Sequence, residues 1–262
     1  MAVVACASVV GSPGVTTTAL GLALTWDRDV LLVDADRDPS QAIQAGYLRG
    51  ADLGGRGLAG LARAHRERRP LHDELTRQSV PLTSDEGVTR RFLPGFAHPG
   101  AASVFGQVWP DLAHALSGLG AAGTDVIVDA GRIGRDGLPT PLLIEADAVL
   151  VCVRSSLRSL AALRLHLPGL VDQLESLPGH AELGLVVIGE SQPYSASEIA
   201  KAFGVTVAFT LPHEPGQASV LSDGAVETRR FGEGSLLRSL RAAASGTRAG
   251  VTARARLIGG AA

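Results

Sequence analysis

The chain has 262 residues, of which 45% are apolar and 19% are charged, so it carries enough apolar material to bury a core and is not a disordered protein. A formal net charge of -2 excludes a surface that is basic throughout, so any contact with nucleic acid would be confined to a local patch. The two cysteines, Cys6 and Cys152, lie in apolar runs without metal-ligand spacing, and no apolar run approaches the length of a bilayer span. We therefore expect a cytoplasmic protein.

Short runs rich in Val, Ile and Leu alternate with longer helical stretches, which is typical of βαβ units around a mostly parallel sheet. Strands are predicted at residues 2–10, 30–33, 125–128, 148–153 and 185–188, with weaker candidates at 91–93 and 206–210. Helices are predicted at residues 17–25, 58–67, 105–119, 156–175, 196–203 and 235–243. Because the strands show no polar alternation, both faces of the sheet should be covered, which predicts a three-layer α/β fold.

Three segments interrupt this pattern. Residues 49–57 and 66–90 are polar or Gly-rich and are expected to form surface loops or a mobile flap. Residues 245–262 lack a stable helical pattern, so we expect one domain over residues 1–244 followed by a flexible C-terminal tail over residues 245–262.

The first strand leads into a Gly-rich turn and then into a helix, which is the order of a phosphate-binding loop. The turn reads Gly11-Ser12-Pro13-Gly14-Val15-Thr16-Thr17-Thr18. The pattern GxxxxGK[ST] would place its last glycine at Thr16, its lysine at Thr17 and its magnesium-binding hydroxyl at Thr18. The single lysine of the chain, Lys201, lies far away, so the loop lacks its usual cation. Taken alone, the turn fits phosphate binding and an ordinary tight βα turn equally well.

Acidic residues follow two of the predicted strands. Asp34 and Asp36 end the strand at residues 30–33, and Asp129 with Gly131 ends the strand at residues 125–128. Open parallel sheets bind ligands at this carboxyl edge, and carboxylates there can hold magnesium-bound water or orient an attacking water. Asp34 and Asp36 would point to the same side if the chain stayed extended. For either strand end alone, solvation of an exposed acid is the commoner reason for such a residue.

These motifs together resemble the MinD/ParA family of P-loop ATPases, the SIMIBI branch with a deviant Walker A loop. The similar segments are the loop GSPGVTTT, then VLLVDADRDPSQ, DVIVDAGRIG and ADAVLVCVRSSLRSLAAL, and the resemblance covers most of residues 2–243. Gly11, Gly14, Val15 and Thr18 match the family loop GKGGVGKT, whereas the signature lysine falls on Ser12 and the P-loop lysine on Thr17. The resemblance implies a doubly wound sheet of about seven or eight strands and a homodimer that closes around two ATP molecules.

The resemblance also implies roles for individual residues. Gly11 through Thr18 would wrap the phosphates, Pro212-His213-Glu214 and Gly189 or Glu190 would lie on the adenine side, and Asp36 would orient the nucleophile. Magnesium would be held by Thr18, Asp34 and Asp129. Arg37, Arg132 or Arg135 could replace the missing lysines in part, or could simply be exposed.

The resemblance and the missing lysines together indicate a degenerate MinD/ParA-like protein with weak or absent ATP hydrolysis. Its expected role is to position a larger assembly for pilus formation or secretion, division or partition, with the Tad-pilus localisation factors as the nearest subgroup. The alternatives are an active ParA-type monomer-dimer switch, a nucleotide-free pseudo-ATPase scaffold and a cofactor-biosynthetic ligase of the same fold. We expect ATP and Mg²⁺ as ligands that bind weakly or not at all, a protein partner, and at most peripheral contact with a membrane.

A cluster of basic residues at positions 65–69 has two interpretations. It can be a solvated helix end, which is the usual case, or a face that contacts DNA or a partner.

Overall fold

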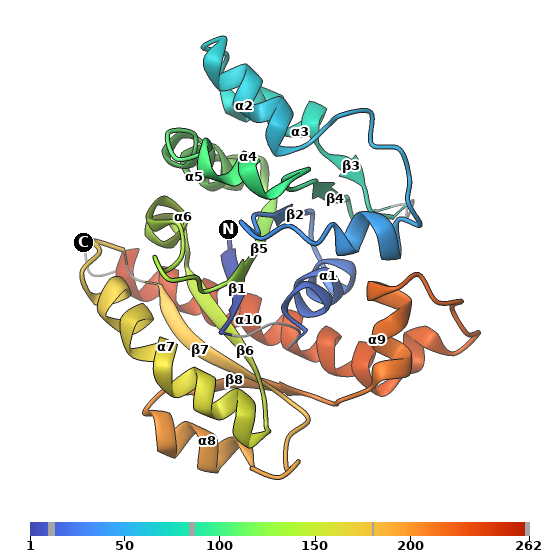
Figure 1. Ribbon diagram of the computed structural model, residues 1–262, viewed down its shortest axis with the longest axis vertical. Helices are drawn as coiled ribbons and strands as arrows, with labels where there is room; N and C mark the ends of the chain where they lie inside the picture. The colour runs from blue at the N-terminus through green and yellow to red at the C-terminus, as the bar shows by residue number, and fades with distance from the viewer. Residues whose placement is uncertain (10–13, 84–86, 180, 260–262) are drawn as a thin grey trace.

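The computed structural model describes residues 1–9, 14–83, 87–179 and 181–259. It contains one sheet of eight strands with helices on both faces (Figure 1). The strand order is β3-β4-β2-β5-β1-β6-β7-β8, and all neighbours are parallel except β3 and β4. The predicted three-layer, doubly wound α/β fold is therefore confirmed.

The strands are β1 (Val3–Ser8), β2 (Val30–Asp34), β3 (Val80–Pro81), β4 (Arg90–Leu93), β5 (Asp125–Arg132), β6 (Ala148–Arg154), β7 (Glu182–Ile188) and β8 (Val207–Leu211). The helices are α1 (Val15–Thr25), α2 (Leu58–Arg66), α3 (Leu71–Gln78), α4 (Pro99–Ser103), α5 (Trp109–Gly118), α6 (Thr140–Glu145), α7 (Leu157–Glu175), α8 (Ala196–Phe203), α9 (Pro215–Ser222) and α10 (Ser235–Gly259). Short irregular turns of helix lie at η1 (Ile43–Tyr47), η2 (Leu119–Ala122) and η3 (Phe231–Glu233).

Both faces of the sheet are buried, which explains the continuous apolar runs of its central strands. Along β1, Val3 and Ala5 face the core beneath α2, α3 and α5 to α8, whereas Val4 and Cys6 face the core beneath α1, α9 and α10. Fully burying one aliphatic side chain of this size contributes roughly 1.5–3 kcal/mol. The two cores together hold the strand ends in a fixed relation, and these ends build the site.

The segment at residues 66–90 is more ordered than the sequence analysis expects. It contains α3 and the short antiparallel strand β3, and Leu71 and Leu75 of α3 are buried. Glu74 is 3% exposed, and its carboxylate accepts a hydrogen bond of 3.0 Å from the guanidinium of Arg77. A helix of eight residues is too short to establish a clear apolar period in the sequence, which is why the prediction failed here.

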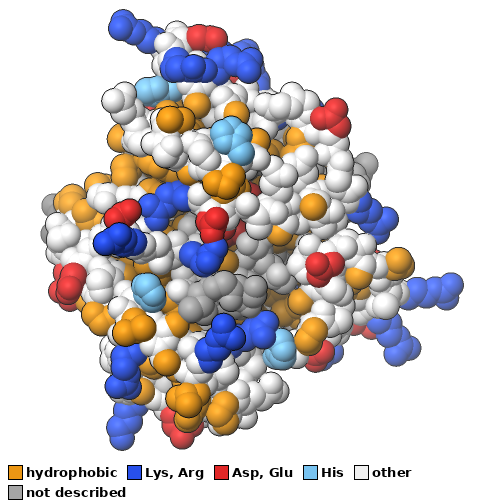
Figure 2. Space-filling model, in the orientation of Figure 1, with side chains coloured by type: hydrophobic (Ala, Val, Ile, Leu, Met, Phe, Trp, Pro, Cys, Tyr) orange, Lys and Arg blue, Asp and Glu red, His pale blue; other side chains and the backbone are white. Residues whose placement is uncertain are grey.

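Basic side chains gather over α2 at one end of the molecule, as Figure 2 shows. Two members of this cluster are bound within the domain, because Arg69 pairs with Glu67 at 2.9 Å and His65 contacts the carboxylate of Asp111 at 3.2 Å. Arg69 is therefore ion-paired within the domain, and His65 lies against an acid of α5.

The C-terminal segment differs most from its prediction. The sequence predicts a helix that ends at residue 243 and an irregular tail, but α10 continues to Gly259. Val251 is buried, and the guanidinium of Arg248 donates to the carboxylate of Asp27 at 2.7 Å. Gly and Ser residues lower the local helix propensity of residues 245–250, and packing against the sheet overrides it. None of the described helices combines the length and apolar content that crossing a bilayer demands.

Candidate functional site

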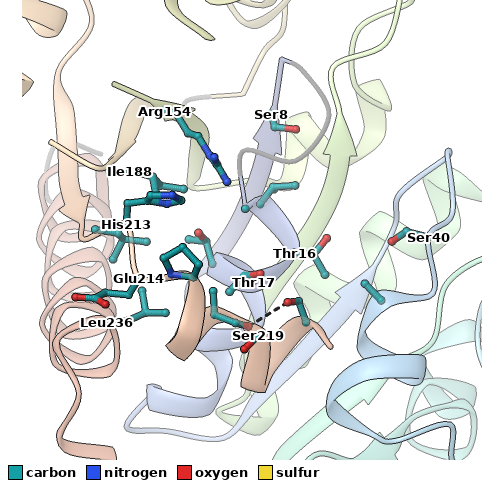
Figure 3. Close-up of a pocket in the computed structure, with 18 of the residues that line it drawn as sticks. Ser8, Thr16, Thr17, Ser40, Arg154, Ile188, His213, Glu214, Ser219 and Leu236 are labelled. Carbon is teal, nitrogen blue, oxygen red and sulfur yellow. Dashed lines mark hydrogen bonds between the residues drawn. The ribbon is translucent and has the colours of Figure 1, made fainter. Parts of the chain in front are cut away.

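A pocket of about 580 Å³ opens at the carboxyl edge of the sheet, between the start of α1, the ends of β2, β5 and β6, and the connection from β8 to α9 (Figure 3). Seven of the predicted nucleotide-site residues line it, namely Gly14, Val15, Thr16, Thr17, Thr18, Pro212 and His213. The predicted residues Gly11, Ser12 and Pro13 lie outside the described part of the chain. The structure therefore brings the two ends of the predicted nucleotide site, about 200 residues apart in the sequence, into one pocket.

The start of α1 forms one wall of this pocket. Gly14 has a φ of 94°, a left-handed conformation that favours glycine, and its carbonyl accepts the first helical hydrogen bond from Thr18 at 2.8 Å. Among the described residues, no side chain caps this helix and no acid lies in its first turn. The amide groups and the positive end of the helix dipole are thus available for an anion.

Asp129 lies below the pocket, within β5, and is 1% exposed. Its carboxylate accepts hydrogen bonds from the hydroxyl of Thr16 and from the backbone N–H of Gly131, the latter at 3.0 Å. Burial raises the pKa of Asp129 to about 6, although these two hydrogen bonds act in the opposite direction. The threonine at the glycine position of the loop therefore binds the acid that the sequence assigns to magnesium.

Asp34 and Asp36 point into different cavities, contrary to the expectation for an extended chain. The carboxylate of Asp34 accepts a hydrogen bond from the backbone N–H of Asp36 at 3.2 Å, so the chain turns directly after β2. Asp36 lines the main pocket, whereas Asp34 lines a second cavity of about 230 Å³ beside Gly95. A Cβ on Gly95 would lie 2.6 Å from the Cγ of Asp34, so this close approach requires glycine.

Asp34 is electrostatically linked to Asp129 even though it faces another cavity. The two residues are register partners in the parallel pair of β2 and β5. Burial and, next, the negative charge of Asp129 raise the pKa of Asp34 to about 8. The strand ends therefore place two carboxyl groups where neither ionises easily.

Asp36 is held against the turn that follows β5. Gly131 has a φ of 64°, and a Cβ on it would collide with the carboxyl group of Asp36. The backbone N–H groups of Asp38, at 2.9 Å, and of Arg132 donate to Asp36. Burial raises the pKa of Asp36, while the charges of Arg132 and Arg37 oppose this shift. The predicted nucleophile-orienting acid thus lies at the pocket wall in a fixed position.

The three arginines that could replace the missing lysines are either bound to other groups or lie away from the pocket. Arg132 lines the pocket but forms an ion pair with Asp38, and the guanidinium of Arg37 donates to the carbonyl of Gly137. Arg135 is exposed and lies away from the pocket lining.

Sequence reasoning missed several residues of the pocket. Arg154, the last residue of β6, extends its guanidinium into it, as Figure 3 shows. Ile188 lies beside His213, as Figure 3 shows, and Leu211 adds to the apolar lining. Ser8, Ser40 and Ser219 add hydroxyl groups. A polar residue at the end of a buried strand was the available signal for Arg154, since the same rule found Asp34 and Asp129. Of the adenine-side candidates, Glu214 lines the pocket, whereas Gly189 and Glu190 do not.

No match was found for this sequence among protein-family models or curated proteins. Solved structures do match over nearly the whole chain. A ParA family ATPase from Chlorobium tepidum TLS aligns with a TM-score of 0.71 and 16% identity, over 93% of this chain and 98% of that chain. The fold is that of the MinD/ParA ATPases.

Two further structures have the same fold. The MinC:MinD cell division protein complex of Aquifex aeolicus matches with a TM-score of 0.69 and 15% identity, over 94% of this chain and 95% of that chain. The septum site-determining protein MinD complexed with Mg-ADP, from Pyrococcus horikoshii OT3, matches with a TM-score of 0.64 and 16% identity. The match covers 93% of this chain and 94% of that chain. The MinD/ParA-like fold inferred from the sequence motifs is thereby confirmed.

Proposed function

We propose that this chain binds ATP with Mg²⁺ in the pocket at the start of α1, hydrolyses it slowly or not at all, and positions a larger assembly. The observation that carries the proposal is the convergence of an uncapped helix N-terminus with acidic strand ends at one pocket. Asp36 lines this pocket, and Asp129 is bound to Thr16 at its floor. The amide groups at the helix N-terminus suit an anion, and the carboxylates suit a divalent cation.

The donor set fits magnesium that is bound partly through phosphate and water. Within the described residues, no group of three or more His, Cys, Asp or Glu side chains could hold a metal alone. Thr18 lines the pocket and would be a direct ligand, while Asp129 and, through its charge, Asp34 would stabilise the metal's waters. A divalent cation would also relieve the repulsion that helps to raise the pKa of Asp34. We therefore propose that metal binding depends on nucleotide.

The apolar wall of the pocket suits a nucleotide base. Ile188, Leu211 and Pro212 line the pocket together with His213. A Cβ on Gly14 would lie 3.3 Å from Cδ1 of Ile188, so this apolar wall adjoins the start of α1. Adenine is the base we propose, in keeping with the Mg-ADP held by the Pyrococcus horikoshii MinD of the same fold.

Slow hydrolysis follows from the missing lysines. A lysine at Thr17 or Ser12 would place a cation beside the terminal phosphates, and its loss should cost on the order of 2–4 kcal/mol of transition-state stabilisation. Asp36 would still orient a water molecule. The protein would then act mainly through its bound state, as a homodimer that docks a protein partner. The Aquifex aeolicus MinD of the same fold is found in a complex with MinC, and a role like that of the Tad-pilus localisation factors is one form of this proposal.

The test is the unfolding temperature of the protein with ATP, in the presence and absence of Mg²⁺. A ligand that binds only the folded state, and is present at a concentration about 100 times its Kd, stabilises that state by about 2.7 kcal/mol. We expect a rise in Tm only when ATP and Mg²⁺ are both present, and its loss in Thr18→Ala. Thr228→Ala, at an exposed residue away from the pocket, is the matched control. Unchanged Tm at millimolar Mg-ATP would instead indicate a nucleotide-free scaffold, and ATP turnover that collapses in Asp36→Ala would indicate an active switch.

A further inference from the structure

We propose that Arg154 supplies the phosphate-binding cation that the loop after β1 lacks, so that the charge comes from the end of β6 instead of from a P-loop lysine. The inference rests on the proposed function, because it assigns a residue to the phosphate chain of the same nucleotide.

The backbone places Arg154 at the right edge of the sheet. β6 pairs in parallel with β1, and Ser8 is opposite Cys152 in that ladder. Arg154 follows Cys152 by two residues, so it lies just beyond the level at which β1 ends. Its side chain lines the pocket together with Gly14 and Thr17 at the start of α1, and Figure 3 shows the guanidinium directed into the pocket.

The guanidinium of Arg154 is available to a ligand, unlike that of the other arginine in the pocket. The other arginine that lines the pocket, Arg132, is paired with Asp38. Arg154 makes no hydrogen bond or ion pair within the described residues, and its side chain is exposed to the pocket opening. The one lysine of the chain, Lys201, is an exposed residue of α8 and lies away from the pocket lining.

Acidic side chains outnumber basic ones in the described lining of the pocket, so an arginine there would help to bind an anion. Its described lining carries the carboxylates of Asp36, Asp38, Glu214 and Asp223. Asp38 is neutralised by Arg132, and Glu214 accepts a hydrogen bond of 3.0 Å from the hydroxyl of Ser235. A polyphosphate entering this acidic pocket needs at least one cation besides magnesium, and a guanidinium can bind two phosphate oxygens at once. Arg154 is placed to do this from the side opposite the acids of β2 and β5.

The ligand class that follows is a nucleotide with at least two phosphates. Arg154 would raise the affinity for ATP and ADP and leave that for adenosine unchanged, since adenosine has no group for the guanidinium to bind. A charge-assisted hydrogen bond of this kind corresponds to a change in Kd of about 10- to 100-fold.

The experiment is a calorimetric titration of Mg-ATP and Mg-ADP into the full chain and its Arg154→Ala, Arg154→Lys and Arg158→Ala variants. Arg158 is an exposed arginine four residues further on, away from the pocket lining, so its variant controls for loss of surface charge. We expect Arg154→Ala to weaken both nucleotides about 10- to 100-fold, with partial recovery in Arg154→Lys and no change in Arg158→Ala. The unfolding temperature without nucleotide should be the same in all four proteins.

The outcomes separate the two proposals. If the unaltered protein binds Mg-ATP and Arg154→Ala binds it equally well, the role of Arg154 is overturned while nucleotide binding stands. If Arg158→Ala loses as much affinity as Arg154→Ala, the effect is one of overall charge, and the assignment to Arg154 is also overturned. If the unaltered protein binds no nucleotide, the proposed function fails, and the role of Arg154 fails with it.

Discussion

The hydroxyl of Thr16 donates a hydrogen bond to the buried carboxylate of Asp129. Thr16 stands where the phosphate-loop pattern has its last glycine, and Asp129, within β5, is an acid that the sequence assigns to magnesium. The side chain that makes the loop atypical is therefore bound to the acid below it. This contact couples the start of α1 to β5, so the two halves of the site should respond together to substitution and to pH.

Removing the hydroxyl of Thr16 should destabilise the protein. Thr16→Val keeps the shape of the side chain but leaves the buried carboxylate with one donor fewer, which should cost about 1–2 kcal/mol at pH 8, where Asp129 is ionised. The cost should be smaller at pH 5. Urea denaturation at the two pH values measures this, with Thr17→Val as the control, because the hydroxyl of Thr17 makes no hydrogen bond within the described residues. Equal effects of the two substitutions would refute a specific role for the Thr16–Asp129 contact.

Gly131 should be intolerant of even a methyl group. Gly131→Ala would strain a left-handed residue with a φ of 64° and push the carboxyl group of Asp36 out of place. The expected loss is about 1–3 kcal/mol of unfolding free energy. Gly134→Ala is the matched control, since a Cβ there would meet only the flexible end of Arg37 at 3.3 Å. A Gly131→Ala variant as stable as Gly134→Ala would contradict the observed packing of Asp36.

The stability of the protein without nucleotide should fall between pH 6 and pH 8. The pKa of Asp34 is raised to about 8 and that of Asp129 to about 6, so the folded state binds protons more tightly than the unfolded chain. Stability linked to such groups is lost as the pH rises through their folded pKa values. We expect a loss of about 1–3 kcal/mol over this interval and a flatter profile in Asp34→Asn.

Asp136→Asn, at an exposed residue, serves as the control for this pH profile and should keep the unaltered slope. Chemical denaturation at several pH values supplies the measurement. A stability that stays level or rises from pH 6 to pH 8 would mean that these acids ionise normally in the folded protein.

The C-terminal half of α10 should contribute to stability. Val251→Ala removes two methyl groups from a residue that is 7% exposed, and this should cost about 1–2 kcal/mol. Leu257→Ala, at a residue that is 76% exposed, should have almost no effect. Thermal or urea unfolding compares the two. If Val251→Ala were as stable as Leu257→Ala, residues 245–259 would behave as the loose tail that the sequence predicts.

The sequence predicted the sheet and the edge that carries the site, because both depend on local patterns. Apolar runs marked the central strands, and two of the acids that follow these runs, Asp36 and Asp129, lie in or beneath the pocket. The directions in which these acidic side chains point were harder to predict from the sequence. Asp34 and Asp36 separate into two cavities because the chain turns between them, where the backbone N–H of Asp36 donates a hydrogen bond to the side-chain carboxylate of Asp34.

Interactions between distant segments account for the other differences. α10 extends past residue 243 because Val251 packs into the core and Arg248 reaches Asp27, and neither contact is visible in the sequence of the tail. Arg154 belongs to the site only because β6 lies beside β1, a neighbour relation that the sequence pattern does not specify. The hydrogen bond from Thr16 to Asp129 likewise depends on the packing of α1 against β5.

The central claim is that a pocket without a P-loop lysine still binds a nucleoside triphosphate. Calorimetric titration of Mg-ATP into the purified full chain tests it most directly. The account predicts saturable binding with a Kd below about 1 mM, equivalent to at least about 4 kcal/mol, that requires Mg²⁺ and is lost in Thr18→Ala. Absence of saturable heat at millimolar Mg-ATP, or the same binding in Thr18→Ala, would contradict it.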